Sequence, residues 1–432
     1  MVRWYGICEY ISEGDLMKKK SFSITFAYVG VLIGAGLSSG QEAMQYFIPF
    51  GEKGLLGLIV VGLLHIFVGG ILLQLGSHFI AESHIDVLKN VSEKYLTKFM
   101  DFALILNCFL MGFVMIAGAG SILNQQFGIP KWIGSIICTI MIISIGMLDF
   151  DKVTEIMGAF TPLVLIFTLI GTFHTITTTR PDFAALDALG KTLKSPLPNV
   201  VLSSLNYFGM CMVSGISMAF VLGGRRTDSS EARFIGIFGG SLVAILTALI
   251  GYTTFVSLNE IIGTDIPMQM ILHNIHPVLG LLMTIIIFGM IFNTAIALFY
   301  SAARRFSNNE IKFKRNLVIF TFIGFILSFL GFKELMGVLY PILGYLGDIL
   351  VVVLVIAWLK GREAIKKEND KRDKLTDLTR KKYKEEKSFD KEDVENLEKF
   401  AESSIIENEK IKKAVEEEIE EEIHEETKRK RE

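Results

Sequence analysis

A run of glycine and hydroxyl residues interrupts the first apolar segment of the chain. Residues 30–42 read Gly-Val-Leu-Ile-Gly-Ala-Gly-Leu-Ser-Ser-Gly-Gln-Glu, between apolar stretches that begin at Phe22 and end at Phe50. Glycine weakens a helix by about 1 kcal/mol relative to alanine, and backbone groups freed inside a bilayer must find protein, ion or ligand partners. The break therefore predicts a solute or ion site, with close packing through small residues as the alternative. The polar run that ends at Glu42 favours the site, because packing alone does not require it.

A second interruption is predicted in the sixth apolar segment. Ser203, Asn206 and Tyr207 precede Gly209 there, and more serine and glycine follow. The first and sixth segments open two halves of five segments each, and an odd number of segments per half gives the halves opposite topology. Broken helices at matching positions are the sequence pattern typical of a transporter site. We expect the two breaks to face each other and to line one cavity.

Composition indicates an all-α integral membrane protein. The chain has 432 residues, 51% of them hydrophobic, and a mean hydropathy of +0.47, which exceeds that of ordinary soluble domains. A spanning helix needs about 20 mostly apolar residues. Reading for such runs predicts ten helices, at residues 22–50, 54–80, 99–123, 130–148, 153–178, 198–222, 232–257, 278–303, 315–331 and 334–359.

The charged residues predict the topology and the domain boundaries. Lys and Arg concentrate in the inner loops when the amino terminus is placed inside, so we expect an inner-membrane protein with both termini cytoplasmic. The expected parts are a cytoplasmic extension (1–20), a transmembrane domain (21–359) and a charged helical tail (360–432). Two outer segments, 182–193 and 266–276, are either lids over an external vestibule or plain interfacial helices.

The tail carries a narrow apolar stripe with steps of mostly three or four residues. We expect a solvated single helix, with a partner helix or a coiled coil as the alternative, since no heptad pattern is sustained. The residues of the stripe are Val394, Leu397, Ala401, Ile405, Ile411, Val415, Ile419 and Ile423.

Enzyme and nucleic-acid motifs are absent from the sequence. Gly190-Lys191-Thr192 has Ala185 where a phosphate-binding loop needs glycine, and the four cysteines have no zinc or disulfide spacing. The basic residues are topology signals rather than a nucleic-acid stripe. We expect a non-enzyme without a cofactor, whose partners are the lipid bilayer and a small-molecule solute, and no nucleic acid.

The segment from Gly34 to Glu42 resembles the Gly-Ala-Gly-x-x-Ser-Gly-Gln-Glu signature of bacterial YkvI-type membrane proteins, and Tyr340–Gly347 resembles their last span. The resemblance covers about residues 18–360. It implies the amino acid–polyamine–organocation superfamily and a LeuT-like five-plus-five inverted repeat with broken first and sixth helices. In that fold, backbone amides at the first break hold a substrate anion, which the helix dipole supports. The matching positions are Ala35, Gly36, Leu37, Ser38, Ser39 and Gly40.

The resemblance also implies a sodium site between the first and eighth spans. The matching carbonyls are those of Gly30 and Ile33, and Met290, Asn293 and Thr294 have the expected i, i+3, i+4 spacing. Asn293 departs from the usual pair of hydroxyl residues, although an amide oxygen can ligate a hard cation. Possible coupling ions are therefore Na⁺ and H⁺.

An acid directly follows the first break. Glu42 is a candidate gate, proton carrier or helix cap, because an intramembrane acid is functional by default. The alternative is a carboxylate paired with a polar group at the vestibule rim. Together these features predict a secondary transporter for a small polar organic solute, with an amino acid or related compound as the first candidate. The alternative is a receptor or scaffold that signals through the tail.

Overall fold

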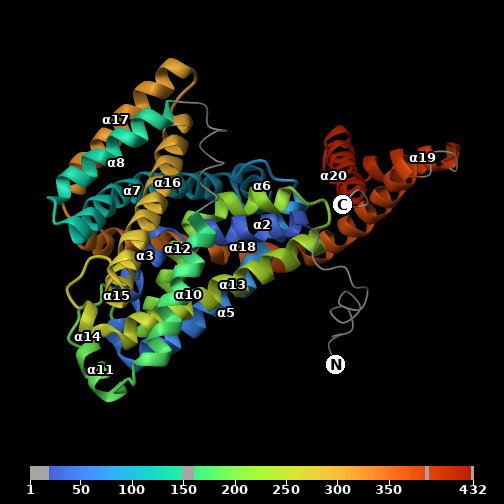
Figure 1. The fold of residues 1–432 in the computed structure, drawn as a ribbon. Helices are drawn as coiled ribbons and strands as arrows, with labels where there is room; N and C mark the ends of the chain where they lie inside the picture. Colours follow the sequence, from blue (N-terminus) through green and yellow to red (C-terminus); the bar gives the residue numbers. More distant parts are fainter. Residues whose placement is uncertain (1–18, 148–159, 385–388, 430–432) are drawn as a thin grey trace.

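The computed structural model describes residues 19–147, 160–384 and 389–429. These residues form helices and no strand (Figure 1). Most of the expected extension (1–20) and the start of the expected fifth span (153–178) lie outside the described residues. The long helices are α5 (Glu52–His78), α7 (Lys94–Phe127), α12 (Val200–Gly224), α13 (Ser229–Val256), α16 (Pro277–Arg305), α17 (Glu310–Ser328) and α18 (Phe332–Lys384). The others before the tail are α2 (Lys19–Leu32), α3 (Ala35–Ser39), α4 (Gln41–Tyr46), η1 (Ile48–Phe50), α6 (His84–Val91), α8 (Lys131–Gly146), α10 (Phe160–Thr178), α11 (Phe183–Gly190), α14 (Leu258–Ile261) and α15 (Pro267–Ile275).

The architecture is that of a multi-pass membrane protein. Within the described residues, six helices are long and apolar enough to cross a membrane, namely α5, α7, α12, α13, α16 and α18, and three shorter apolar helices accompany them. Large apolar side chains such as Leu56, Leu63 and Phe173 are exposed on the outer faces, as lipid contact requires. The count of ten spans and the inverted repeat stay predictions.

The first span is broken, as the sequence predicts. The helix α2 ends at Leu32, and α3 begins after Gly34. Gly40 then separates α3 from α4 with a φ of +80°, a left-handed conformation that glycine adopts without a steric penalty.

The sixth span is not broken, so this part of the expected fold is wrong. The helix α12 runs without interruption through Gly209. A Cβ atom at Gly209 would lie 2.3 Å from the Gly344 carbonyl oxygen, and one at Gly347 would lie 1.8 Å from the Gly209 carbonyl oxygen. Glycine serves here to bring the backbones of α12 and α18 together, as small residues do between membrane helices.

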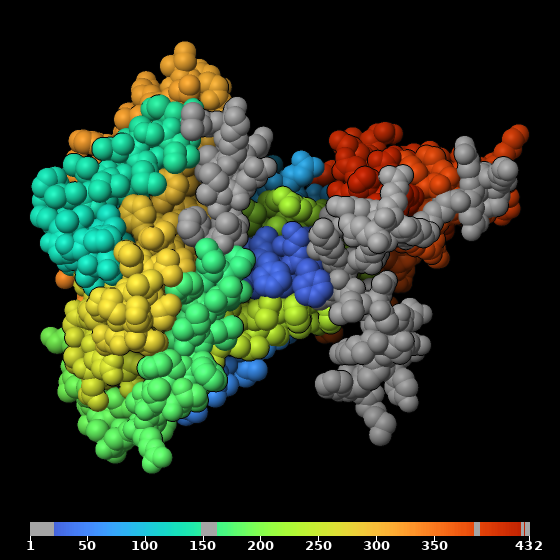
Figure 2. All heavy atoms as spheres, in the orientation of Figure 1, coloured from blue at the N-terminus to red at the C-terminus, as the bar shows by residue number. Residues whose placement is uncertain are grey.

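The tail continues α18 and then folds back. The expected boundary at residue 360 falls inside α18, which is continuous from Phe332 to Lys384. The helices α19 (Lys391–Glu402) and α20 (Asn408–Arg429) return along it and form a separate lobe at one end of the molecule (Figures 1 and 2). The expected solvated single helix is wrong, because Ala401, Ile411, Val415 and Ile419 of the stripe are buried in a cluster with Ile80 and Leu375. Val394 and Ile405 of the stripe stay exposed.

The close approach of α12 and α18 generates the first prediction. Gly347→Ala places a methyl group against the Gly209 carbonyl, so overpacking of about 1–3 kcal/mol should lower the thermal unfolding midpoint in detergent. The control is Gly337→Ala in the same helix, where a Cβ meets no atom within 4 Å. That variant should match or exceed the parent midpoint, since alanine favours a helix by about 1 kcal/mol. Equal midpoints for the two variants would contradict the close backbone contact between α12 and α18 at Gly209 and Gly347.

Candidate functional site

The interruption of the first span lies inside the helical bundle. The α3 residues from Ala35 to Ser39 are buried, whereas Gly34 is half-buried and has no atom within 4 Å of its Cβ position. Gly40 is tightly packed instead, because its Cβ position lies 3.0 Å from Thr254 and 3.1 Å from Pro267. The break therefore has one side open to free space and one side closed by neighbouring helices.

The two serines of the break satisfy its own backbone. The Ser38 hydroxyl donates to the Gly34 carbonyl at 3.0 Å, and the Ser39 hydroxyl donates to the Gly36 carbonyl at 2.6 Å. Ser39 Oγ also accepts from the Gln41 amide at 3.1 Å. These bonds replace some of the helical bonds lost at the break, which has no water to supply them in a bilayer. In this conformation the hydroxyls stabilise the broken segment rather than point into open space.

The carboxylate of Glu42 occupies the space above Gly36. A Cβ atom at Gly36 would lie only 1.9 Å from Glu42 Oε1. Glu42 is 5% exposed, and the Tyr207 side chain approaches it from α12. An acid buried this deeply in a membrane protein is costly, which keeps Glu42 a candidate functional residue. The absence of a side chain at Gly36 is what allows Glu42 to fold back over the break.

The polar residues of α12 meet the broken span, although α12 itself is continuous. Ser203 Oγ donates to the Tyr46 carbonyl at 2.7 Å, and Tyr46 Oη donates to Asn206 Oδ1 at 3.3 Å. Asn206 Nδ2 donates to the Pro341 carbonyl of α18 at 2.9 Å. The Tyr207 ring lies against the Tyr46 ring, with centroids 5.3 Å apart. The amide of Asn206 therefore positions the end of α4 between α12 and α18.

Two features of the contact between α12 and the broken span differ from the sequence-based interpretation. Gly209 contacts the α18 backbone, which leaves no room for a solute at that position. Tyr46 was missed, although it bonds through both its carbonyl and its hydroxyl. Its place about one helical turn after Glu42, the end of the polar run, is the sequence signal that could have drawn attention to it.

The proposed sodium ligands come from two parts of the bundle. Met290 is buried on α16, and Asn293 and Thr294 are half-buried there. Gly30 is half-buried in α2, and Ile33 is buried at the break. The helix α16 packs against α3 and α7, and positions i, i+3 and i+4 share one helix face. The sodium site stays a prediction.

The segment at 266–276 covers the closed side of the break. Its helix α15 contacts Gly40 through Pro267 and Met268, and Met268 is fully buried. The side chain of Gln125 in α7 fixes the preceding loop, because its Oε1 accepts from the amides of Asp265 and Ile266 at 3.1 and 3.0 Å. The segment is thus a packed cover rather than a plain interfacial helix.

Two lysines hold the loop before this cover. Lys131 and Lys333 pair with the Asp265 carboxylate at 2.5 and 3.3 Å. Burial alone would raise the pKa of Asp265, but the two positive charges outweigh burial and hold its pKa below the ordinary value. Asp265 therefore remains ionised and keeps the cover fastened to α8 and α18.

Comparison with known proteins supports the sequence resemblance. No family model matches the chain. The uncharacterized membrane protein YkvI of Bacillus subtilis (strain 168) is 23% identical over 339 residues, which cover 76% of this chain and 93% of YkvI. The uncharacterized protein YyaD of the same organism is 24% identical over 330 residues, which cover 76% of this chain and 94% of YyaD.

A solved structure has a similar fold. The inward-facing conformation of Mhp1 has a TM-score of 0.57 at 14% identity, covering 79% of this chain and 77% of that chain. A mutant of the Eremococcus coleocola manganese transporter has a TM-score of 0.47 at 12% identity, covering 78% of this chain and 76% of that chain. The first of these likenesses supports a LeuT-like fold. In sequence the chain is therefore similar to YkvI and YyaD, and in fold it is similar to Mhp1.

Proposed function

We propose that the protein is a secondary active transporter of the inner membrane that carries a small polar organic solute, with an amino acid or related compound as the first candidate. The observation that carries this proposal is the broken first span, which is open beside Gly34 and closed around Gly40. A break buried among helices supplies backbone groups for a solute at membrane depth. The transporter unit would comprise residues 21–359, with residues 360–432 as its tail.

The proposed solute site surrounds α3. The amides of Ala35, Gly36 and Leu37 form its first turn, where intrahelical acceptors are lacking, and they would receive the anionic group of the solute. Tyr207 forms the α12 wall, and Asn206 keeps that wall in place. Glu42 lies over Gly36 in this structure, so its carboxylate must turn aside when a solute binds, which is the behaviour of a gate.

The proposed coupling ion is Na⁺ or H⁺, and the two act through different residues. Sodium would use the Gly30 and Ile33 carbonyls together with Met290, Asn293 and Thr294 on α16. A proton would use Glu42. Removing Na⁺ tests the first set, and changing the external pH at constant Na⁺ tests the second.

A thermal-shift screen followed by uptake measurements tests the proposal. The purified full-length protein is mixed with amino acids and related metabolites, with and without Na⁺ and at two pH values. We expect one chemical class to raise the unfolding midpoint. The same class should accumulate in proteoliposomes when a Na⁺ or H⁺ gradient is imposed. A solute that binds but never accumulates would contradict transport and favour a receptor.

The site generates a prediction about Gly36. Gly36→Leu should displace Glu42 and fill the break, so binding should weaken by roughly ten- to a hundredfold, equivalent to losing about 1.5–3 kcal/mol of charge-assisted hydrogen bonding. The matched control is Gly62→Leu in α5, whose Cβ position lies 3.0 Å from Ala244 and outside the proposed site. That variant should lose stability but keep its affinity. Unchanged affinity in folded Gly36→Leu would refute the site assignment.

The proposed topology is tested by cysteine labelling. In a background without native cysteines, Lys191→Cys and Asn274→Cys should react with a membrane-impermeant maleimide in intact cells, because α11 and α15 lie at the end of the molecule away from the tail (Figure 1). Glu402→Cys should react only after the cells are permeabilised. All three positions are exposed. Labelling of Glu402→Cys together with either of the others in intact cells would overturn the assigned orientation.

A further inference from the structure

The tail is anchored to the ends of the membrane helices by buried polar groups. Arg372, which is 2% exposed, donates to the Ser77 and His78 carbonyls at 2.9 and 2.7 Å. Its Nε also bonds to Glu368 at 3.0 Å. The guanidinium thus caps the carboxyl end of α5, where carbonyls lack intrahelical partners and the helix dipole favours a cation.

A second anchor holds the amino end of α13. Asn369 Oδ1 accepts from the Ser229 amide at 2.7 Å and from the Ser229 hydroxyl at 2.8 Å. Both residues are buried. An orphan amide at the start of a helix needs such an acceptor, and here the acceptor comes from the tail portion of α18.

The third anchor is Glu418 of α20, which reaches the turn between α12 and α13. Glu418 Oε2 accepts from the Thr227 amide at 2.9 Å and from the Thr227 hydroxyl at 2.6 Å. Glu418 Oε1 pairs with Arg226 at 3.0 Å. Arg226 is 2% exposed and Glu418 is 7% exposed, so removing Arg226 would leave the Glu418 carboxylate buried without the cation that pairs with it.

This ion pair extends to the first membrane helix. Arg226 also pairs with Glu231 of α13, and Glu231 Oε1 accepts from the Ser21 hydroxyl of α2 at 2.6 Å. One end of α2 is therefore tied to the tail through two side chains. Its other end is the break beside Gly34, where the backbone has free space.

The tail also stabilises a strained residue of the α5–α6 turn. Ile80 has a φ of +41°, which a β-branched residue rarely adopts. Its side chain is 5% exposed and belongs to the tail cluster with Leu375, Ile411 and Val415. Strain of this kind persists only where surrounding contacts hold it, and these contacts come from the tail.

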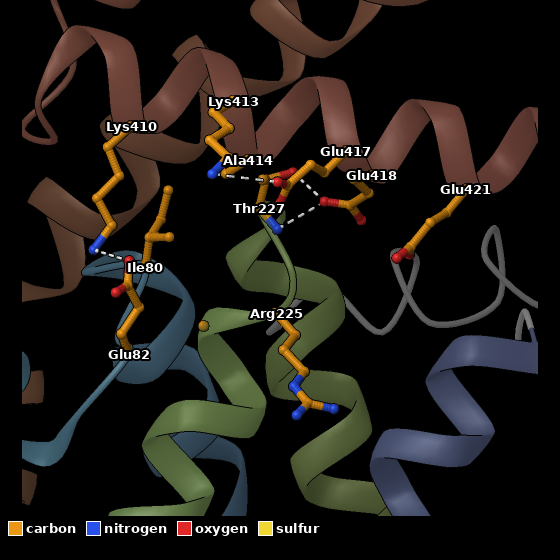
Figure 3. A pocket seen from close by; sticks show the side chains of 11 residues that line it. Ile80, Glu82, Arg225, Thr227, Lys410, Lys413, Ala414, Glu417, Glu418 and Glu421 are labelled. Atoms are coloured by element: carbon orange, nitrogen blue, oxygen red, sulfur yellow. Dashed lines mark hydrogen bonds and ion pairs between the residues drawn. The ribbon is translucent and has the colours of Figure 1, made fainter. Parts of the chain in front are cut away.

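The seam between the tail and the membrane helices is incompletely filled. A cavity of about 400 Å³ lies beside the Glu418 anchor, bordered by Ile80, Gly224, Arg225 and Ala414. Figure 3 shows Glu418 facing Thr227 across this seam, and Lys410 reaching Glu82 farther along α20. The helix α20 is thus held against the membrane helices by a few anchors with a pocket beside them.

We propose that α18–α20 form a releasable clamp that restrains α2 through Glu418, Arg226 and Glu231. Docking of α20 braces Arg226, whose pair with Glu231 holds the amino-terminal end of α2 at Ser21 and restrains α2 from pivoting at Gly34. Release of α20 frees that end. The tail thereby regulates the movement of the segment that precedes the break. The clamp rests on the proposed function only for its effect on transport, because the movement of α2 is measured without a solute.

Hydrogen–deuterium exchange of the full-length protein tests the clamp with two variants. Glu418→Ala removes the ionic anchor, and Val415→Asp disrupts the apolar cluster without touching Arg226. We expect both to remove the protection of α20 and to accelerate exchange in Ser21–Leu32 by about tenfold, the factor for one lost charge-assisted hydrogen bond. The control is Glu417→Ala on the same helix, whose pair with Lys413 is exposed. It should exchange like the parent.

The outcomes separate the clamp from simple unfolding and from the transport proposal. Unchanged exchange in α5 and α13 shows that the variants are folded. If α20 loses protection while Ser21–Leu32 exchanges as in the parent, the tail does not restrain α2 and the proposal is overturned. If α20 stays protected in both variants, these contacts are not the anchors, which also overturns it. Failure of solute uptake alone would leave the exchange result standing and count against the transporter proposal.

Discussion

The unmet hydrogen-bonding demand of a helix broken inside the membrane governs the rest of this structure. The backbone groups released between Leu32 and Phe47 must find partners in the protein or in a bound solute, because lipid supplies none. Ser38 and Ser39 meet part of this demand locally, and Ser203 meets another part from α12. A broken helix in a bilayer is stable only when neighbouring helices are built to receive it, so α12 is polar where it meets α4.

The same demand explains why α12 is both polar and rich in glycine. Its polar side chains face the broken span, and Gly209 brings its backbone against α18 at Gly344 and Gly347. Asn206 joins the two contacts, because it bonds Tyr46 on one side and Pro341 on the other. The side of α12 that borders the candidate site is therefore held in place by α18. Asn206 has the side chain of a ligand, but in this structure it positions α12 against its neighbours.

Much of the fold and part of the site could be predicted from the sequence. Long apolar runs are unambiguous, and the break at Gly34 was predictable because three glycines and two serines coincide within one span. The break expected at Gly209 was wrong, since an isolated glycine weakens a helix and equally permits close packing. Only the position of α18 decides between these two roles. The stripe on the tail was recognised, but its partners were not, because Leu375 and Ile80 are distant in the sequence. Arg226 was interpreted as one of the basic topology signals. The residues around it in the sequence give no sign that it pairs with Glu418, which lies far along the chain.

The continuity of α18 has a mechanical consequence. A continuous helix that runs from Gly347, where it packs against α12, into the tail lobe acts as a lever with its pivot among the membrane helices and its far end in the lobe. The arm from Gly347 to Lys384 is about 55 Å long at 1.5 Å per residue. A tilt of about five degrees at Gly347 would displace the far end by roughly 5 Å, about one helical turn. A small tilt of α18 among the membrane helices would thus produce a larger displacement of the tail lobe outside the membrane.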